Sequence, residues 1–357
     1  MKLKCLKLFA LLLVLLMAIT SCARFDFLGT DTTEEATTKE TMTEEATTEE
    51  ATTEEATTEE IVTEEVTTEE TEQEEKKVKN ILMIGNSFCY YYVEELSGIA
   101  RADGYDLVIA NLYKSGAPIS DQYDSYKTGN KVGELFVTEK RRKSTGTYSF
   151  EGALNYAKEN LGADWDVITL QGSSRGALLG DAEADLNATL PYAKELFAYL
   201  AQAYPEAELY WHQTWSYEIG YGSEKQSELE KVMSAEKRTS MYEIKKETSY
   251  RIASETGVKL VPTGDAWEIA RQNALIGTTL CQRTNVNNNL GDYYHDGDIG
   301  GGQYLNACVW YEVLMGESCV GNTWRPTNYK LSEEKIAILQ AAAHEAVAAV
   351  YGADHAK

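Results

Sequence analysis

Short apolar runs recur along the chain after residue 80 and indicate buried strands. The runs cover residues 81–84, 107–112, 167–170, 209–211 and 259–261. Runs this short, rich in branched and aromatic side chains, are typical of strands that are buried on both faces of a sheet. Each run therefore predicts one strand, which gives a sheet of about five strands.

Segments with helical periodicity lie between and after these runs. Their apolar residues fall on one helical face at about residues 91–102, 151–160, 184–204, 224–256, 302–314 and 332–351. Strands that alternate with helices imply right-handed crossovers and a parallel sheet with helices on both faces. The pattern predicts a single doubly wound α/β domain over residues 77–357, a length that one domain of this class can have.

The first 22 residues have the pattern of an export signal. Three lysines precede an apolar run over residues 8–19, which is too short for a comfortable membrane span. The run ends in Ile-Thr-Ser followed by Cys22, which resembles the lipobox of bacterial lipoproteins and implies lipidation of Cys22. We expect an exported protein, held outside the membrane at the bacterial cell surface by acyl chains. The alternative is an ordinary signal peptide in which Cys22 has no such role.

Residues 23–76 carry the repeat Ala-Thr-Thr-Glu-Glu and few large apolar side chains. Such a segment cannot bury a core and its like charges repel, so it predicts a disordered, extended tether. Residues 31–76 hold 19 acidic and 2 basic residues and account for most of the net charge of −24. The predicted domain has a net charge of −10 and no basic stripe. Nucleic acid is therefore not an expected partner.

Cysteine usage leaves the redox state open. Beyond the export signal the chain has Cys89, Cys281, Cys308 and Cys319, in a compartment that permits disulfides. A bridge from Cys319 to Cys281 or to Cys308 is one alternative. A buried free thiol is the other for Cys308, because it lies in an apolar helical segment. No Cys-x-x-Cys pair or His/Cys cluster indicates zinc.

A candidate nucleophile follows the first predicted strand. The strand ends in Gly85-Asn86-Ser87, which places a serine hydroxyl at a strand-to-helix turn. Open parallel sheets bind ligands at the carboxyl ends of their strands, and Gly85 gives the backbone room to turn. Ser87 is therefore the leading catalytic candidate, although the same tripeptide is also common in plain turns.

A serine nucleophile needs a base and a group that orients the base. Among the four histidines, His344 lies in the terminal helical segment and His355 in the tail, away from the strand ends. His212 follows the fourth strand and can face the site. His295 lies in a glycine-rich loop, and Asp292 precedes it by three residues, within reach of the imidazole. We expect His295 to be the base and Asp292 its partner.

These segments resemble the motif blocks of the SGNH (GDSL-like) hydrolase superfamily. The Gly-Asn-Ser turn at Ser87 matches the first block, Gly116 the second, and Asp292-x-x-His295 the last. The resemblance spans nearly the whole predicted domain. It implies a flavodoxin-like sheet with strand order 2-1-3-4-5 and a Ser87-His295-Asp292 triad. Better-known members have Gly-Asp-Ser in the first block, and proteins with the variant found here are often uncharacterised.

The resemblance also implies an oxyanion hole made of the backbone N–H groups of Ser87 and Gly116 and one side-chain donor. Many members supply that donor from the asparagine of a Gly-x-Asn-Asp block after the third strand. This chain has Leu-Gln-Gly-Ser-Ser there, so Gln171 is the candidate donor, with Ser173 or Ser174 assisting. The loss of one such donor costs about 10²- to 10³-fold in rate, so this departure separates a competent esterase from a slow one.

Together these features predict a surface-tethered serine esterase that removes an O-acyl group, with acetyl as the expected group, from a carbohydrate or related glycan. The ester class rests on the triad. The glycan rests on the tether, the aromatic residues and analogy with the family. Candidate substrate-binding residues are Asn86, Ser173, Ser174, His212 and Trp215, although plain packing or hydrogen bonding is the alternative for the last two. The mechanism needs no metal or organic cofactor.

Two other classes of function stay open. Without the block III asparagine, the domain can be a catalytically weak or inactive module that binds glycans. The carboxylates Asp292, Asp296 and Asp298 with His295 can instead hold a cation such as calcium. In that case the protein is a metal-dependent phosphoesterase or a sulfatase-like hydrolase, which a chelator would inhibit.

Overall fold

The computed structural model describes residues 77–178, 180–217, 234–276, 301–327 and 329–356. The predicted export signal with Cys22, the tether, Cys281, Asp292 and His295 lie outside the described residues. The domain boundaries at residues 22 and 76 and the roles of these residues therefore stay predictions.

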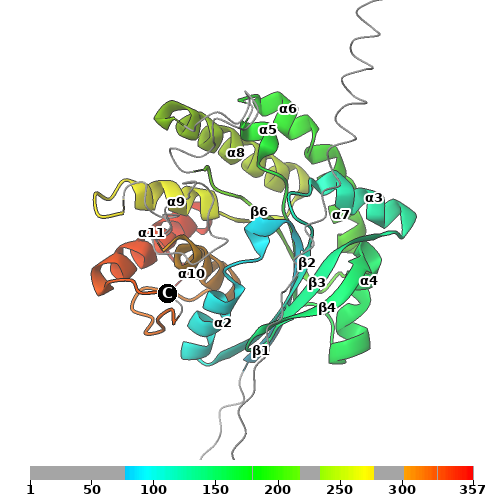
Figure 1. Ribbon diagram of the computed structural model, residues 1–357, viewed down its shortest axis with the longest axis horizontal. Coiled ribbons are helices and arrows are strands. Elements are labelled where there is room, and N and C mark those ends of the chain that lie inside the picture. Colours follow the sequence, from blue (N-terminus) through cyan, green and yellow to red (C-terminus); the bar gives the residue numbers. More distant parts are fainter. Residues whose placement is uncertain (1–76, 179, 218–233, 277–300, 328, 357) are drawn as a thin grey trace, which may run out of the picture. The chain divides into compact units, whose positions relative to one another are not determined.

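Five neighbouring strands of the sheet are parallel to one another (Figure 1). They are β1 (Lys77–Gly85), β2 (Tyr105–Tyr113), β5 (Val167–Leu170), β6 (Glu208–His212) and β7 (Lys259–Val261). Each contains one of the apolar runs. Their order, β2-β1-β5-β6-β7, is the predicted order 2-1-3-4-5. The doubly wound α/β class is therefore confirmed.

The predicted number of strands is wrong, because the described part of the chain forms a sheet of seven strands. A hairpin of β3 (Lys131–Thr138) and β4 (Arg142–Ser149) pairs antiparallel with the outer side of β2. β4 lies at one edge of the sheet, and its residues are mostly polar and either exposed or partly exposed to solvent. It therefore has no apolar run from which a strand could be predicted.

Helices cover both faces of the sheet. Figure 1 shows α2, α9, α10 and α11 on one face and α3, α4 and α7 on the other. The helices are α2 (Val93–Ala102), α3 (Ile119–Thr128), α4 (Phe150–Tyr156), α5 (Arg175–Leu178), α6 (Ala182–Asn187), α7 (Leu190–Ala203), α8 (Ala235–Thr256), α9 (Thr263–Arg271), α10 (Gly302–Met315) and α11 (Glu333–Tyr351). A 3₁₀ turn, η1 (Ser87–Cys89), follows β1, and a π turn, η2 (Ala157–Leu161), extends α4. No helix in these ranges is long and apolar enough to span a membrane.

The helix predicted over residues 184–204 is two helices, α6 and α7. Pro191 stands in the first turn of α7, where its missing N–H has no intrahelical partner to lose. A proline ring clashes with the turn before it, so α6 cannot continue into α7. The break lies at Ala188 and Thr189, and the Thr189 hydroxyl donates back to the Asp185 carbonyl at 2.8 Å.

Successive side chains of β1 point to opposite faces of the sheet, and each face packs into its own apolar core. Ile81 and Met83 pack into the apolar cluster beneath α2, α10 and α11, whereas Leu82 and Ile84 pack into the cluster beneath α4 and α7. All four side chains are fully buried. β1 is thus a central strand whose carboxyl end is held in place by packing on both sides.

Candidate functional site

The turn after β1 exposes one serine among buried neighbours. In residues 81–89, Ser87 is the only residue that is not buried. Asn86 caps η1, because its side-chain Oδ1 accepts a hydrogen bond from the Phe88 N–H at 3.1 Å. The Cys89 N–H donates to the Asn86 carbonyl at 3.2 Å, which closes the turn. The sequence-predicted nucleophile therefore lies on a tightly bonded turn at the carboxyl edge of the sheet.

Gly85 allows the end of β5 to approach this turn. A Cβ at this position would collide with Gln171 Oε1 and lie 3.1 Å from Gln171 Cβ and 3.2 Å from Cys89 Sγ. The backbone at Gly85 is ordinary strand, so the requirement is for space rather than for a special φ angle. The glycine of the Gly-Asn-Ser motif is therefore needed for contact between β1 and the segment after β5.

Asn86 and Gln171 form a reciprocal pair of buried amides. The backbone N–H of Asn86 donates to Gln171 Oε1 at 3.1 Å, and Gln171 Nε2 donates to Asn86 Oδ1 at 2.9 Å. The other Nε2 proton is directed to the Gly172 carbonyl. Because a backbone N–H must meet an oxygen, these contacts also define the orientation of the Gln171 amide.

The third oxyanion donor predicted at Gln171 is not supported by this arrangement. Both protons of its amide are used inside the protein, and the side chain is 1% exposed. Asn86, also proposed to bind substrate, is 2% exposed and bonded at both ends of its side chain. The two residues hold the turn of Ser87 in place and do not face a ligand.

Asn86 also fixes the loop after β2. Its Nδ2 donates to the Ala117 carbonyl at 3.0 Å. The turn just before Ala117 contains Gly116, which is exposed and has φ of +63°, a conformation that favours glycine. The Gly116 N–H has no acceptor within the described ranges. It is therefore available as the backbone donor that the sequence predicted.

The loop after β5 is fixed by a buried ion pair. Lys245 Nζ of α8 lies 3.3 Å from Asp185 Oδ2 of α6, and these side chains are 3% and 2% exposed. The same Nζ donates to the Ser173 carbonyl at 3.2 Å. Ser174 is buried, and its Oγ lies 3.3 Å from Thr214 Oγ1. Ser174 is thus a structural residue, whereas Ser173 is half-buried beside the turn.

His212 is buried and neutral. Burial lowers the pKa of its imidazole from 6.5 to about 3. Its Nε2 lies 2.9 Å from Thr263 Oγ1, and the Thr263 hydroxyl donates to the Gln213 carbonyl. Thr263 must therefore accept from His212, which places the proton on Nε2. Such an imidazole is a packed, hydrogen-bonded residue, and the structure does not support a role in substrate binding.

Trp215 is also a packing residue. Its ring is fully buried and stacks on Trp267, with the ring centroids 4.6 Å apart and the planes 10° apart. Phe88 approaches it edge-on at 4.7 Å. The indole therefore packs against the turn of Ser87 through Phe88. This position does not support the predicted contact with a sugar ring.

A second group of serine, histidine and carboxylate occurs at the end of α10. Ser318 Oγ lies 3.4 Å and Glu312 Oε2 3.1 Å from His344, and both approach the same ring atom, Nδ1. A catalytic relay needs the serine and the carboxylate on opposite nitrogens of the imidazole. This group therefore does not have the geometry of a catalytic triad.

The described cysteines are buried free thiols. Cys89, Cys308 and Cys319 are unpaired, so the structure does not contain the bridge between Cys308 and Cys319 that the sequence left open. Burial raises the pKa of Cys89 to about 12, and its thiol donates to the Asn86 carbonyl at 3.2 Å within the turn of Ser87. A neutral thiol is a poor nucleophile. Cys89 is thus part of the packing, and Asn111 donates to its carbonyl at 2.5 Å.

Sequence reasoning missed several contacts that fix the segments around Ser87. Ala117 takes part through its backbone, which no residue pattern reveals. Asn111 and Lys245 gave a weak signal, because each is a polar residue in an otherwise apolar position of a strand or helix.

Within the described residues, no group of three His, Cys, Asp or Glu side chains could hold a metal ion. Asp292, Asp296, Asp298 and His295 lie outside those residues.

Solved structures similar to this chain include one of a DUF4886 family protein from Bacteroides uniformis. It is 24% identical, with a TM-score of 0.61, over 78% of this chain and 96% of that one. A protein described as a GDSL-like lipase from Parabacteroides merdae is 14% identical, with a TM-score of 0.39, over 66% and 95% of the two chains. Phospholipase A1 from Streptomyces albidoflavus is 10% identical, with a TM-score of 0.34, over 66% and 98%.

No curated protein sequence matches the chain. The family described as a domain of unknown function, DUF4886, matches residues 80–346. The chain therefore belongs to the DUF4886 family.

Proposed function

We propose that the protein is a serine esterase that removes O-acetyl or similar O-acyl groups from a carbohydrate at the bacterial cell surface. The observation that carries the proposal is the turn at Ser87. It places Ser87, the one residue of 81–89 that is not buried, at the carboxyl edge of the sheet, and its capping residue Asn86 is bonded to the loop of Gly116. Such a turn is where a serine nucleophile and backbone oxyanion donors can act on one carbonyl.

The reaction proceeds in two halves. Ser87 Oγ attacks the ester carbonyl while His295, oriented by Asp292, takes the hydroxyl proton. The N–H groups of Ser87 and Gly116 donate to the oxyanion. His295 then protonates the leaving sugar oxygen, which leaves an acyl group on Ser87, and water hydrolyses this ester by the reverse proton transfers. No cofactor takes part in these steps.

The surface location and the glycan rest on the sequence. An export signal ending at Cys22 and an acidic repeat before the domain are suited to a lipid-anchored protein that reaches polymers outside the membrane. The acyl group is small in this proposal.

The hydrolysis of p-nitrophenyl acetate tests the proposal. We expect turnover by the purified protein, with losses of at least about 10³-fold in Ser87→Ala and in His295→Ala. Ser115→Ala, which removes an exposed hydroxyl next to Gly116, is the matched control and should keep its rate. EDTA should have no effect. Equal rates in all four proteins would exclude Ser87, and inhibition by EDTA would favour a metal-dependent phosphoesterase or sulfatase-like enzyme.

One observation favours a second function, a glycan-binding module with little or no activity. Gln171 stands where related blocks supply an oxyanion donor, but its amide is used within the protein. With two backbone donors alone, the rate would be about 10²- to 10³-fold lower. An intact fold that binds acetylated glycan without turnover would support this second function.

A further inference from the structure

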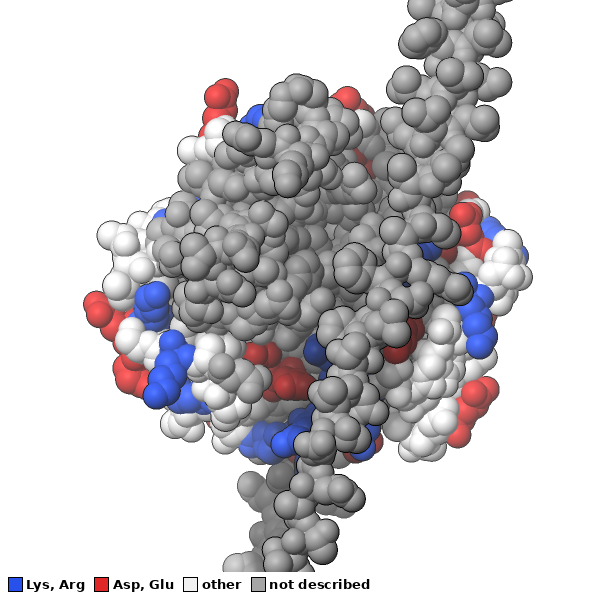
Figure 2. Space-filling view, viewed as in Figure 1, with Lys and Arg blue, Asp and Glu red and all other residues white. Residues whose placement is uncertain are grey.

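The end of the β3–β4 hairpin gathers cations without partners. Lys140, Arg141 and Lys143 are exposed, and within the described ranges none of their side chains has an ion pair or a hydrogen bond. Several other exposed cations are paired, such as Lys194, whose Nζ lies 2.7 Å from Glu255. Figure 2 shows basic side chains together along the lower edge of this face. On a domain with a net charge of −10, the three cations concentrate positive charge within four residues.

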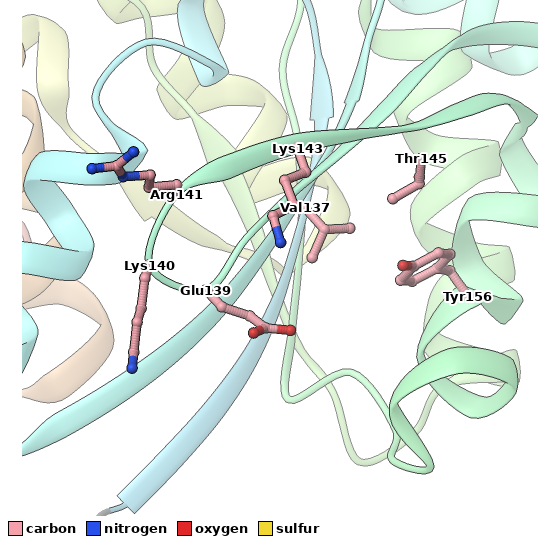
Figure 3. Close-up of a pocket in the computed structure, with 7 residues that line it drawn as sticks. All are labelled: Val137, Glu139, Lys140, Arg141, Lys143, Thr145 and Tyr156. Atoms are coloured by element: carbon pink, nitrogen blue, oxygen red, sulfur yellow. The ribbon is translucent and has the colours of Figure 1, made fainter. Parts of the chain in front are cut away.

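A cavity of about 440 Å³ lies between this hairpin and α4. Figure 3 shows the Lys143 ammonium and the Glu139 carboxylate on the hairpin side, with the Tyr156 ring across from them. The Tyr148 ring packs edge-on against Tyr156, with the ring centroids 5.9 Å apart. The cavity thus combines an ammonium, a carboxylate and a fixed aromatic ring.

A second cavity, of about 390 Å³, lies on the other side of the hairpin, against α2. Lys140 and Arg141 line both cavities, so the two are neighbours. In Figure 3 these two side chains extend away from Tyr156. Arg101 and the half-buried Trp324 also line the second cavity. The Trp324 ring lies against Gly98 of α2, where a Cβ would collide with it.

The cations, carboxylates and aromatic rings that line the two cavities indicate the class of ligand. Unpaired cations attract a ligand with several negative charges. Carboxylates such as Glu139 and Glu94, which also line the cavities, repel a plain polyanion but accept hydrogen bonds from hydroxyls. Aromatic rings on both sides offer flat apolar surfaces. A polymer with anionic groups, hydroxyls and flat rings has all three properties, and two adjoining cavities are suited to more than one of its units.

We propose that the two cavities beside residues 139–143 form a binding site for an acidic polysaccharide. Lys140, Arg141 and Lys143 contact its anionic groups, and Tyr156 and Trp324 contact its sugar rings. The site is separate from Ser87, and its function does not depend on ester hydrolysis. It would hold the polymer on the domain while the tether keeps the protein at the surface.

Binding of polygalacturonate to the purified protein at low and at physiological salt tests the proposal, with Ser87→Ala measured beside the wild type. We expect binding by both, weakening as salt rises. The variant with Lys140→Ser, Arg141→Ser and Lys143→Ser should lose about tenfold or more in affinity, as expected for three exposed charge contacts. The matched control, Lys131→Ser with Lys330→Ser and Lys335→Ser, makes the same change in net charge and should lose less than about twofold.

Three results would overturn the proposal. Equal losses in the two triple variants would show that only net charge matters. Binding of inorganic polyphosphate as tight as that of polygalacturonate would show that sugar rings are not recognised. Binding to phosphatidylglycerol vesicles, without binding to polygalacturonate, would assign the surface to a membrane. Dextran, which has hydroxyls but no charge, should bind at least tenfold more weakly than polygalacturonate.

Discussion

Asn86 determines how the candidate nucleophile is held. Its Oδ1 accepts from the turn of Ser87 and from Gln171, while its Nδ2 donates to Ala117. An aspartate, which the better-known Gly-Asp-Ser turns carry, has no proton to donate to the Ala117 carbonyl when it is ionised. The asparagine is therefore matched to this backbone, and the exchange from aspartate has a structural reason.

Asn86→Asp should destabilise the protein by about 1–3 kcal/mol at neutral pH, because a buried carboxylate oxygen would face the Ala117 carbonyl. The environment raises the folded-state pKa of the new carboxyl above its unfolded value of about 3.9. The loss of stability is therefore complete above the raised folded-state pKa. It shrinks as the pH falls toward the pKa of the unfolded state, because the protonated acid can donate to the Ala117 carbonyl. Urea unfolding between pH 4 and pH 8 measures this change.

Asn160→Asp is the control for this prediction. Asn160 also donates to a backbone carbonyl, that of Tyr156 at 3.1 Å, but it is exposed. Water can solvate the new carboxylate there, so the free energy of unfolding should change by less than about 0.5 kcal/mol. Equal effects at the two positions would contradict the role given to Asn86.

His212 should make the protein sensitive to acid. Its folded-state pKa of about 3 lies below the unfolded value of 6.5, so between these values only the unfolded state binds a proton. Stability therefore falls as pH drops below 6.5, by about 1.4 kcal/mol per unit. From pH 7 to pH 5, wild type should lose about 2 kcal/mol more than His212→Gln, which can still donate to Thr263. Identical losses in urea titrations would show that His212 is not buried and neutral.

At the scale of elements, the contact between β1 and the end of β5 depends on Gly85. Gly85→Ala should displace Gln171 and cost about 1–3 kcal/mol of stability, with a loss of esterase activity. Gly104→Ala is the control, because Gly104 has φ of +87° and nothing within 4 Å of an added Cβ. It carries backbone strain alone and should keep its activity. Equal esterase activity in the two variants would show that the position of Gln171 does not matter for catalysis.

The pair of Lys245 and Asp185 joins α8, α6 and the loop of Ser173. Lys245→Met should cost about 3–5 kcal/mol because it leaves Asp185 buried without a partner, and adding Asp185→Leu should restore much of this loss. The exposed pair of Lys194 and Glu255 is the control, and Lys194→Met should cost less than about 1 kcal/mol. A double variant less stable than Lys245→Met alone would contradict this account. Thermal unfolding gives the comparison.

The central strands could be predicted because burial on both faces leaves a short, largely apolar run, as in β1 and β5. The hairpin could not be predicted. β4 lies at the edge of the sheet, and its polar, partly exposed residues leave no such run. Helix α9 was also missed. Only nine residues long, it begins after Pro262 with Thr263 and Gly264, which is typical of a loop.

Within the site, local sequence predicted the turn of Ser87 and the loop of Gly116 but not how they are joined. The links are side chain to backbone contacts between segments distant in sequence, such as Asn86 to Ala117. Gln171 was placed at the correct strand end, yet its direction depends on the fold, because it bonds to Asn86 instead of facing a ligand. Burial likewise changed the interpretation of His212 and Trp215.

At the scale of the whole domain, parallel topology brings the site together. Gly85 pairs with Tyr113, and Ile84 with Leu170, so β1, β2 and β5 end at the same edge. The turns that follow these strands therefore meet, although they are distant in the chain. The antiparallel hairpin reverses direction and places its cations apart from this edge. One sheet thus carries a candidate catalytic edge and a separate charged surface.

Reaction with a fluorophosphonate, followed by mass spectrometry of the peptides, tests the central claim most directly. The reagent phosphonylates an activated serine and releases fluoride. We predict a single adduct on Ser87, formed in step with the loss of p-nitrophenyl acetate hydrolysis and absent from Ser87→Ala. An adduct on another serine, or hydrolysis that persists in fully labelled protein, would contradict the assignment of Ser87 as the nucleophile.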